Sequence, residues 1–193
     1  YNEIKDFVKI DNPDPNVKSK DYLLKRSNGS NDNDICQLIQ EDSLDKFIKY
    51  INDTHCSFDS IIEQSLYETN PFLIGKTPRL IEYACFYGSI QIIKFLLANN
   101  VILTPNIYYY AVHSNKIEVF DIFEEYKINL DSEMKKKLLK ISIKCHHIDI
   151  TNHILSLYFK NDQEEFIRSN RIEHNFVDYC FHYYNYFFFP NQF

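Results

Sequence analysis

Residues 80–100, LIEYACFYGSIQIIKFLLANN, constrain the fold more than any other stretch of this chain. Their pattern predicts two short amphipathic helices, the first ending near Tyr87, with Gly88 providing the backbone freedom for a reversal. The second helix is expected to present a stripe of apolar residues at helical spacing, namely Ile92, Ile93, Phe95, Leu96 and Leu97. Neither helix could bury that much apolar surface alone. The unit therefore needs a neighbour of the same kind, as in a repeat protein.

Further segments align with this unit when Ala84 serves as an anchor, the small residue four positions before the turn. The anchors are Leu38, Ala84, Ala111, Ser142 and Cys180. The turn residues that follow them are Asp42, Gly88, Asn115, His146 and Tyr184. Aspartate and asparagine tolerate a positive φ well, whereas His146 and Tyr184 fit such a turn less comfortably. The gap between the first two anchors is the longest, which predicts an insertion near residues 53–76.

The unit around Ala84 resembles an ankyrin repeat, in which a small residue lies four positions before a glycine and an Ile-Val/Leu-Leu helix follows. The positions that match are Ala84, Gly88, Ile92, Ile93, Leu96 and Leu97. Thr77-Pro78 lies two residues too early for the family pattern, and Glu82 replaces its usual histidine. The segments ICQLIQEDS, IEYACFYGSIQI, SIKCHHIDI and FHYYNYFFFP are similar to divergent ankyrin proteins of trichomonads and related protists. Those proteins carry an ankyrin-associated domain of unknown function, and the resemblance spans residues 34–189.

The resemblance implies an all-α fold, an ankyrin-repeat solenoid of stacked helix-turn-helix units. Residues 34–193 would form the array, with about four repeats and a truncated fifth. Residues 1–33 would hold the end of an upstream helix, at 1–10, and a polar linker. Within that linker, DYLLK predicts a single helical turn, whereas RSNGSNDND is rich in residues typical of loops.

For function, the resemblance implies non-catalytic protein binding, as a scaffold or adaptor. Partners of ankyrin arrays usually contact the concave face, which here means the residue before each anchor and those two and three after it. The expected partner-binding residues are Tyr83, Phe86, Tyr87, Tyr110, His113, Tyr179, His182 and Tyr183. Tyrosine gives large contact area at low entropic cost. An alternative interpretation is that these aromatic residues pack against neighbouring loops of the same chain.

Two other functions stay open. The chain could be a structural spacer within a longer array, with no partner of its own, or a cryptic metal- or thiol-dependent enzyme. His146, Asp149 and His153 would share one face of a continuous helix and could bind a metal there, but a turn at His146 breaks that helix. Cys145 precedes two histidines, yet no glycine-rich oxyanion loop accompanies it. No cofactor is therefore expected.

Composition narrows the class of partner and the compartment. A formal net charge of −6 argues against nucleic acid, whose phosphates need a basic surface. Lys135–Lys137 is the one basic run and predicts a solvated helix face. The five cysteines are widely spaced and lack a CxxC pair, which predicts reduced, mostly buried thiols and a cytoplasmic protein. No apolar run approaches the ~18 residues of a membrane span, so no membrane partner is expected.

The last expectation concerns the C-terminal aromatic run at 183–189, followed by Pro190. A terminal repeat needs a polar outer face, and this stretch is the least polar in the chain. The pattern predicts an exposed aromatic patch, self-association through it, and repeats that continue past Phe193 in a longer protein. The chain also starts at Tyr1 without a methionine, so a removed or unseen N-terminus stays open.

Overall fold

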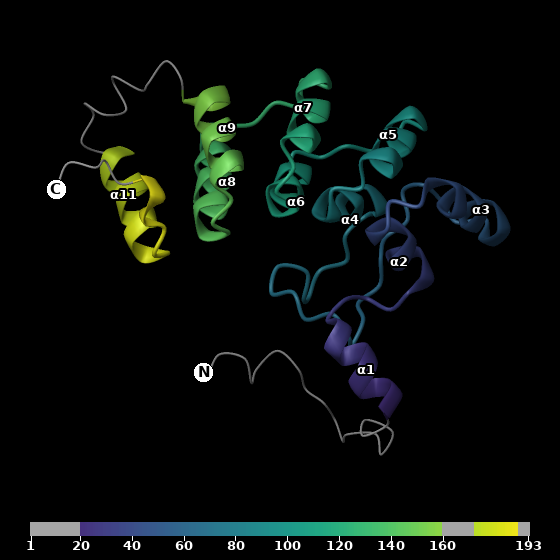
Figure 1. Cartoon of the computed structure of the whole chain (residues 1–193). Coiled ribbons are helices and arrows are strands. Elements are labelled where there is room, and N and C mark those ends of the chain that lie inside the picture. The colour runs from purple at the N-terminus through teal and green to yellow at the C-terminus, as the bar shows by residue number, and fades with distance from the viewer. Residues whose placement is uncertain (1–19, 160–171, 189–193) are drawn as a thin grey trace.

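The computed structural model describes residues 20–159 and 172–188, and this part of the chain is all-helical (Figure 1). The α-helices are α1 (Lys20–Asn28), α2 (Asp34–Gln40), α3 (Leu44–Thr54), α4 (Leu80–Tyr87), α5 (Ile90–Ala98), α6 (Ile107–Ser114), α7 (Ile117–Glu125), α8 (Ser132–Lys144), α9 (Ile148–Tyr158) and α11 (Ile172–His182). A short 3₁₀ helix, η3 (Tyr186–Phe188), follows α11. The predicted all-α class is confirmed. The helix predicted at residues 1–10 lies outside the described residues.

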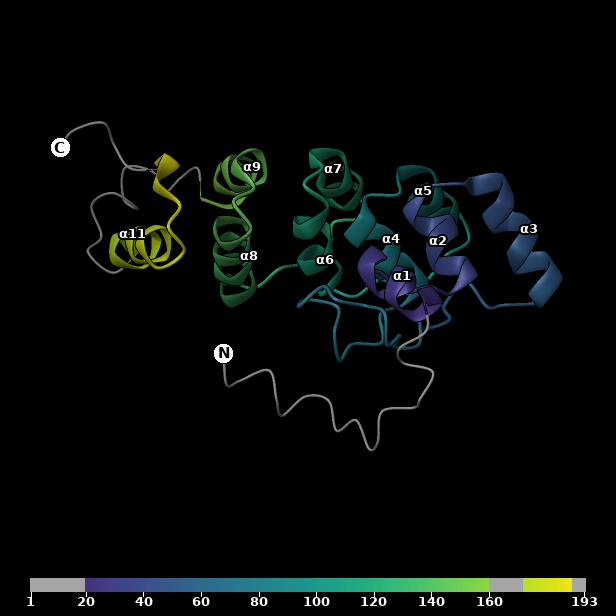
Figure 2. The same cartoon turned by 60° about the horizontal axis from the view of Figure 1, so that its bottom comes forward.

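The helices from α2 to α9 come in pairs that lie side by side in chain order, and α11 follows them (Figure 1). We call α2, α4, α6, α8 and α11 the inner helices, and each packs against the next. We call α3, α5, α7 and α9 the outer helices, and each packs against its own inner helix. Figure 2 shows α7 and α9 in one layer and α6, α8 and α11 in another. The paired helices bury the apolar stripes that neither could bury alone.

All five residues predicted at the turns adopt the left-handed backbone conformation. Their φ angles are 50° for Asp42, 66° for Gly88, 53° for Asn115, 57° for His146 and 56° for Tyr184. Each ends an inner helix. The predicted turn at Gly88 is therefore confirmed, and so is the two-helix reading of residues 80–100.

The same backbone hydrogen bond closes four of the five turns. The amide of the residue after the turn donates to the anchor carbonyl, as in a Schellman motif. The pairs are Ser43 to Leu38 (3.0 Å), Ser89 to Ala84 (2.9 Å), His147 to Ser142 (3.1 Å) and Asn185 to Cys180 (2.8 Å). In the third unit the amide of Lys116 donates to Oγ of Ser114 instead, at 3.1 Å. The alignment by anchors therefore matches a recurring piece of backbone geometry.

The anchors Ala84 and Ala111 are fully buried, which allows the helices around them to pack closely. Ser142 and Cys180 are buried as well. Leu38 differs because it is only half-buried. In α2 the core positions belong to Ile35, Cys36 and Ile39, and the longer Leu38 side chain does not need to fit between two close helices.

Side chains after the turns also join each unit to the one before it. Oγ of Ser89 donates to the carbonyl of Ile39. Nδ1 of His147 donates to the carbonyl of Val112 at 2.8 Å, and Nδ2 of Asn185 to that of Ile143 at 3.0 Å. The donors are equivalent in the alignment, and so are the acceptors, each one residue after an anchor. In the third unit Nζ of Lys116 reaches the carbonyl of Gly88 instead, at 2.7 Å.

The segment between α3 and α4, residues 55–79, is a long irregular loop that packs on α1. The rings of Tyr22 and Tyr67 are 5.6 Å apart, and the amide of Thr69 donates to the carbonyl of Gly29 at 3.0 Å. These contacts explain why α1 is longer than the single turn predicted at DYLLK and extends to Asn28. Stabilisation comes from residues far along the chain, which local sequence does not show.

Candidate functional site

The positions predicted to face a partner do come together along the inner helices. Nε2 of Gln40 in α2 donates to the Tyr83 hydroxyl in α4 at 3.0 Å. In the next step Phe86 of α4 lies 5.4 Å from the ring of His113 in α6. Sγ of Cys145, just after α8, lies 3.5 Å from Nδ1 of His113. These contacts trace one continuous surface across successive units, which we call the inner face.

The 55–79 loop covers the inner face at α4 and α6. Phe72 stacks on Phe86 with ring centroids 5.9 Å apart and an angle of 5° between the rings. It meets Tyr110 edge-on at 5.0 Å and lies 4.0 Å from the ring of His113. Nζ of Lys76 sits 3.1 Å from the Phe72 ring centroid, on the same cluster. We call this part of the inner face the covered half.

Burial on the covered half divides the predicted partner-binding residues. Tyr83, Phe86 and Tyr110 are buried, and Tyr87 and His113 are half-buried. Burial raises the pKa of Tyr110 to about 12 and raises the pKa of Tyr83 further. For Phe86, Tyr110 and His113 the structure favours the alternative interpretation, packing against a loop of the same chain. Tyr83 is instead bonded to Gln40 of α2.

The inner face at α8 and α11 differs, because the 55–79 loop does not reach it in the described structure. Tyr179 of α11 and Tyr183, which directly follows the helix, are half-buried there, and His182 is exposed. Nζ of Lys140 in α8 lies 5.2 Å from the Tyr179 ring centroid, and Lys144 is exposed one turn further on. We call this part the open half. It combines tyrosine rings with lysine ammonium groups.

His113 lies where the two halves meet. Burial and, to a lesser extent, the nearby His147, Lys76 and Lys144 lower its pKa to about 4. The imidazole is therefore neutral at pH 7. Its Nε2 is buried without a hydrogen-bond partner among the described residues.

The pairing of Cys145 with His113 is the nearest approach to a catalytic dyad in the described chain. Thiol catalysis needs a thiolate, usually beside an imidazolium. Here burial raises the pKa of Cys145, while the pKa of His113 is lowered. Both groups are neutral at pH 7, so the geometry does not activate the thiol. In the sequence the histidines next to Cys145 are His146 and His147. The contact with His113 could have been predicted only from the alignment of successive units, which places His113 and Cys145 in neighbouring units.

The three residues considered for a metal do not converge. His146 is exposed at its left-handed turn, and Asp149 is exposed at the start of α9. His153 faces α7 instead, with Nε2 3.4 Å from a carboxylate oxygen of Asp121. Across residues 20–159 and 172–188, no cluster of three or more histidine, cysteine or acidic side chains could hold a metal ion.

All five cysteines are free, as predicted for reduced thiols. Cys36, Cys85 and Cys180 are buried, whereas Cys56 and Cys145 are half-buried. Burial raises the pKa of Cys36 to about 12 and that of Cys180 to about 11. These thiols act as small apolar core residues.

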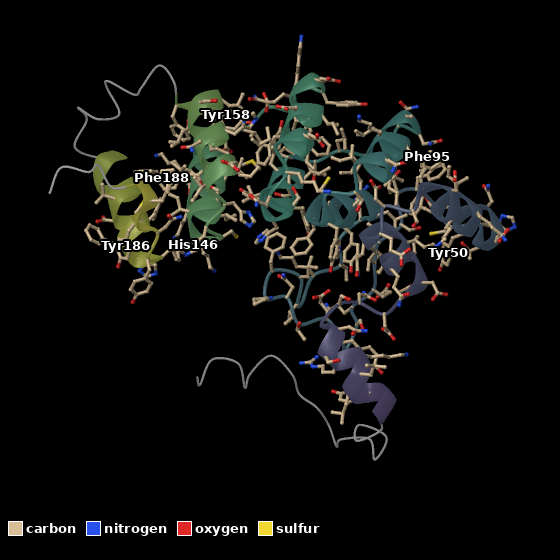
Figure 3. The ribbon with its side chains drawn as sticks, viewed as in Figure 1. Tyr50, Phe95, His146, Tyr158, Tyr186 and Phe188 are labelled. Carbon is tan, nitrogen blue, oxygen red and sulfur yellow. The ribbon has the colours of Figure 1, made fainter. Side chains whose placement is uncertain are left out.

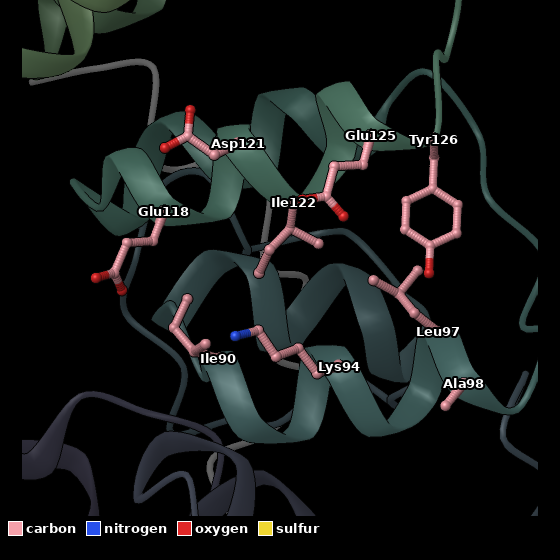
Figure 4. A pocket seen from close by; sticks show the side chains of 9 residues that line it. All are labelled: Ile90, Lys94, Leu97, Ala98, Glu118, Asp121, Ile122, Glu125 and Tyr126. Carbon is pink, nitrogen blue, oxygen red and sulfur yellow. The ribbon is translucent and has the colours of Figure 1, made fainter.

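A second surface feature, which sequence reasoning missed, lies between α5 and α7 (Figure 4). It is a groove of about 580 Å³. Its lining residues come from both helices: Ile90, Lys94, Leu97, Ala98, Glu118, Asp121, Ile122, Glu125 and Tyr126. The sequence signal was present in α7, where Glu118, Asp121 and Glu125 share one face at helical spacing.

The predicted aromatic patch at the C-terminal unit is present. Phe181, Tyr184, Tyr186 and Phe187 are 55%, 73%, 56% and 63% exposed. Figure 3 labels Tyr186 and Phe188 beside α11, and Phe188 packs edge-on to Phe176 at 5.7 Å. Self-association through this patch stays a prediction. Phe189 and Pro190 lie outside the described residues.

None of the helices described is both long and apolar enough to cross a membrane. In comparisons with family profiles, curated proteins and solved structures, nothing matches this chain.

Proposed function

We propose that this chain is a non-catalytic protein-binding module, an ankyrin-type solenoid that holds its partner on the open half of the inner face. One observation carries the proposal. Tyr179 and His182 of α11, and Tyr183 directly after it, lie on the same surface as Lys140 and Lys144 of α8, and this surface is not under the 55–79 loop. The equivalent aromatic positions of α4 and α6 are already occupied by contacts within the chain.

The recurring geometry supports the array. The five left-handed turns, their shared hydrogen bonds and the side-chain bonds between units all repeat at aligned positions. Such bonds fix each inner helix relative to the next, so the open half is ordered before a partner arrives. A preorganised surface loses less entropy on binding than a flexible one.

The residues of the open half suit protein recognition. Tyrosine side chains contribute contact area with few rotatable bonds, and their hydroxyl groups can make hydrogen bonds. The lysines beside them would pair with carboxylates, so we expect the partner to present acidic groups. Free thiols in all five cysteines fit the cytoplasmic location that we propose.

Affinity capture with matched variants tests this function. The full chain and the triple variant Tyr179→Ala, His182→Ala, Tyr183→Ala would be used as bait in a cytosolic extract. The control is Leu66→Ala, because Leu66 is 72% exposed and lies on the 55–79 loop. We expect a defined set of proteins that the parent and the control retain and that the triple variant loses. Equal capture by all three baits, with circular dichroism showing that all are folded, would reject the open half as the binding surface.

A further inference from the structure

The outer helices do not pack uniformly. α3 packs against α5, and α7 packs against α9, whereas a groove of about 580 Å³ lies between α5 and α7 (Figure 4). In a row of helices, the side chains of neighbours normally fill the space between them. Here that space is open, and the side chains of both helices line it.

The floor of the groove is apolar. Ile90, Leu97 and Ala98 contribute from α5, and Ile122 contributes from α7. Figure 4 shows Ile122 projecting towards α5 and the Tyr126 ring beside Leu97 at one end of the groove. Ile90 and Ile122 are half-buried and Ala98 is exposed, so apolar surface stays accessible to a partner.

The rim of the groove is acidic. Glu118, Asp121 and Glu125 line it from α7, whereas Lys94 of α5 is the one basic residue in the lining. No ion pair within the described residues joins Lys94 to these carboxylates, and Asp121 contacts His153 of α9 at 3.4 Å. Three carboxylates against one ammonium group leave a negative rim around an apolar floor.

The walls determine which form of peptide can bind. Both walls are helices, whose backbone groups are paired within the helix, so a strand cannot add to an exposed edge. Recognition has to use side chains, as when an amphipathic helix lies in a groove. α5 has nine residues and a length of about 13 Å, which matches two to three turns of a bound helix.

We propose that the groove between α5 and α7 binds a short basic amphipathic helix of a partner protein. Its apolar side chains would contact Ile90, Leu97 and Ile122, and its lysine or arginine groups would pair with Glu118 and Glu125. This site is separate from the open half of the inner face and does not depend on the function proposed for it.

A second copy of this chain is a poor occupant. Among the described helices the most basic is α8, which exposes Lys136, Lys137, Lys140 and Lys144. The apolar residues of α8, among them Leu138, Leu139 and Ile143, are buried in the core. The helix therefore offers charge to the groove without the apolar face that its floor requires, and charge complementarity points to a different protein.

The test uses a defined probe, a fluorescein-labelled peptide of about 14 residues, a length at which helix formation becomes favourable. It carries leucines at positions i, i+4 and i+7 and lysines on the flanking positions. Two control peptides are a version with glutamate in place of lysine and a scrambled version of the same composition. Binding to the full chain is measured by fluorescence anisotropy.

Matched variants distinguish peptide binding in the groove from attraction to the general negative charge of the chain. Glu118→Gln with Glu125→Gln removes two charges at the rim, and Asp53→Asn with Glu63→Gln removes two at exposed sites elsewhere. Ala98→Trp fills the groove at an exposed position. We expect the rim variant and Ala98→Trp each to weaken binding by about tenfold or more, with the Asp53 and Glu63 variant within about twofold of the parent.

Several outcomes would overturn the proposal. They are absence of saturable binding, equal binding of the scrambled peptide, equal weakening by both charge variants, or no effect of Ala98→Trp in a folded protein. Sedimentation of the parent and the rim variant adds one more: if the rim variant changes the self-association of the chain, the occupant is a second copy. Affinity capture by the open half is unaffected by any of these results.

Discussion

The covered and open halves of the inner face occupy equivalent positions in the alignment, yet they differ in what lies over them. On α4 and α6, Phe86 and Tyr110 contact Phe72 of the 55–79 loop. On α8 and α11, Lys144 and His182 are exposed at the positions that correspond to Phe86. Equivalent positions in repeated units therefore need not share a role. A loop from another part of the chain decides which of them are available to a partner.

The two halves also differ in charge. The covered half is built from neutral rings, and burial raises the pKa of its tyrosines. Burial also lowers the pKa of Lys76, the basic residue that lies over Phe72. The open half places lysines at exposed positions, where ammonium groups stay hydrated. The covered half is thus suited to stability and the open half to recognition.

The largest difference in stability between the two halves is expected when equivalent anchor residues are replaced. Ala84 is fully buried where α4 packs between α2 and α6, so Ala84→Phe should cost about 3 kcal/mol of unfolding free energy through overpacking. Cys180→Phe, at the equivalent anchor of α11, should cost about 1 kcal/mol, because α11 packs on one inner helix, α8, in the described structure. Urea denaturation followed by circular dichroism measures both. If both variants lost the same unfolding free energy, the cores of the two halves would be equally tightly packed.

The next difference concerns the loop. Phe72→Ala should lower the free energy of unfolding by about 2 kcal/mol, because Phe86 and Tyr110 lose their ring contacts. Tyr179→Ala on the open half should cost less than about 1 kcal/mol. Urea denaturation of the two variants compares them directly. A Phe72→Ala protein as stable as the parent would show that the loop does not hold the covered half together.

The sequence predicted much of this backbone. The helix-turn-helix unit was predicted from Ala84, Gly88 and the apolar stripe of α5. The anchor positions then predicted all five turns, including those at His146 and Tyr184. These features are local: a small residue permits close packing, and six residues form each turn. The exposed aromatic patch near Tyr186 was also predicted, because a run of aromatic residues at the end of an array is evident in the sequence itself.

The sequence did not predict which half of the inner face would be free. The contact of Phe72 with Phe86 and Tyr110 depends on how a long irregular loop folds back, and no periodicity encodes that path. The pairing of Cys145 with His113 and the gap between α5 and α7 depend in the same way on the spacing between units. Tertiary packing decides these features, so they appeared only in the structure.

A smaller effect is expected from pH at the junction of the halves. The pKa of His113 is about 4 in the folded protein, below the ordinary value of about 6.5 in the unfolded chain. Between these values the unfolded state binds more protons, so stability is full above pH 6.5 and falls as the pH drops towards 4. The loss should be about 1–2 kcal/mol, and His113→Gln should remove it.

The positive charges of Lys76 on the covered half and Lys144 on the open half both lower the pKa of His113. Lys76→Met and Lys144→Met should each raise the pKa of His113, which NMR titration of its ring measures. A ring that titrates near 6.5 in the parent protein would show that His113 is not buried between the halves.

The last contrast lies in the turns. Gly88 has a φ of 66°, and a Cβ atom there would come within 2.7 Å of Cδ of Lys116, whose Nζ binds the Gly88 carbonyl. Gly88→Val should therefore cost about 1–2 kcal/mol, through backbone strain and loss of that bond. Tyr184 holds a φ of 56° in the open half and is 73% exposed. For Tyr184→Gly, relief of strain offsets the added freedom of the unfolded chain, so the change should stay within about 0.5 kcal/mol of zero. Thermal or urea denaturation of both variants gives the comparison. If Tyr184→Gly destabilised the protein as much as Gly88→Val, the Tyr184 ring would itself stabilise the last unit. That result would contradict the view that the turn needs only a residue able to adopt a positive φ.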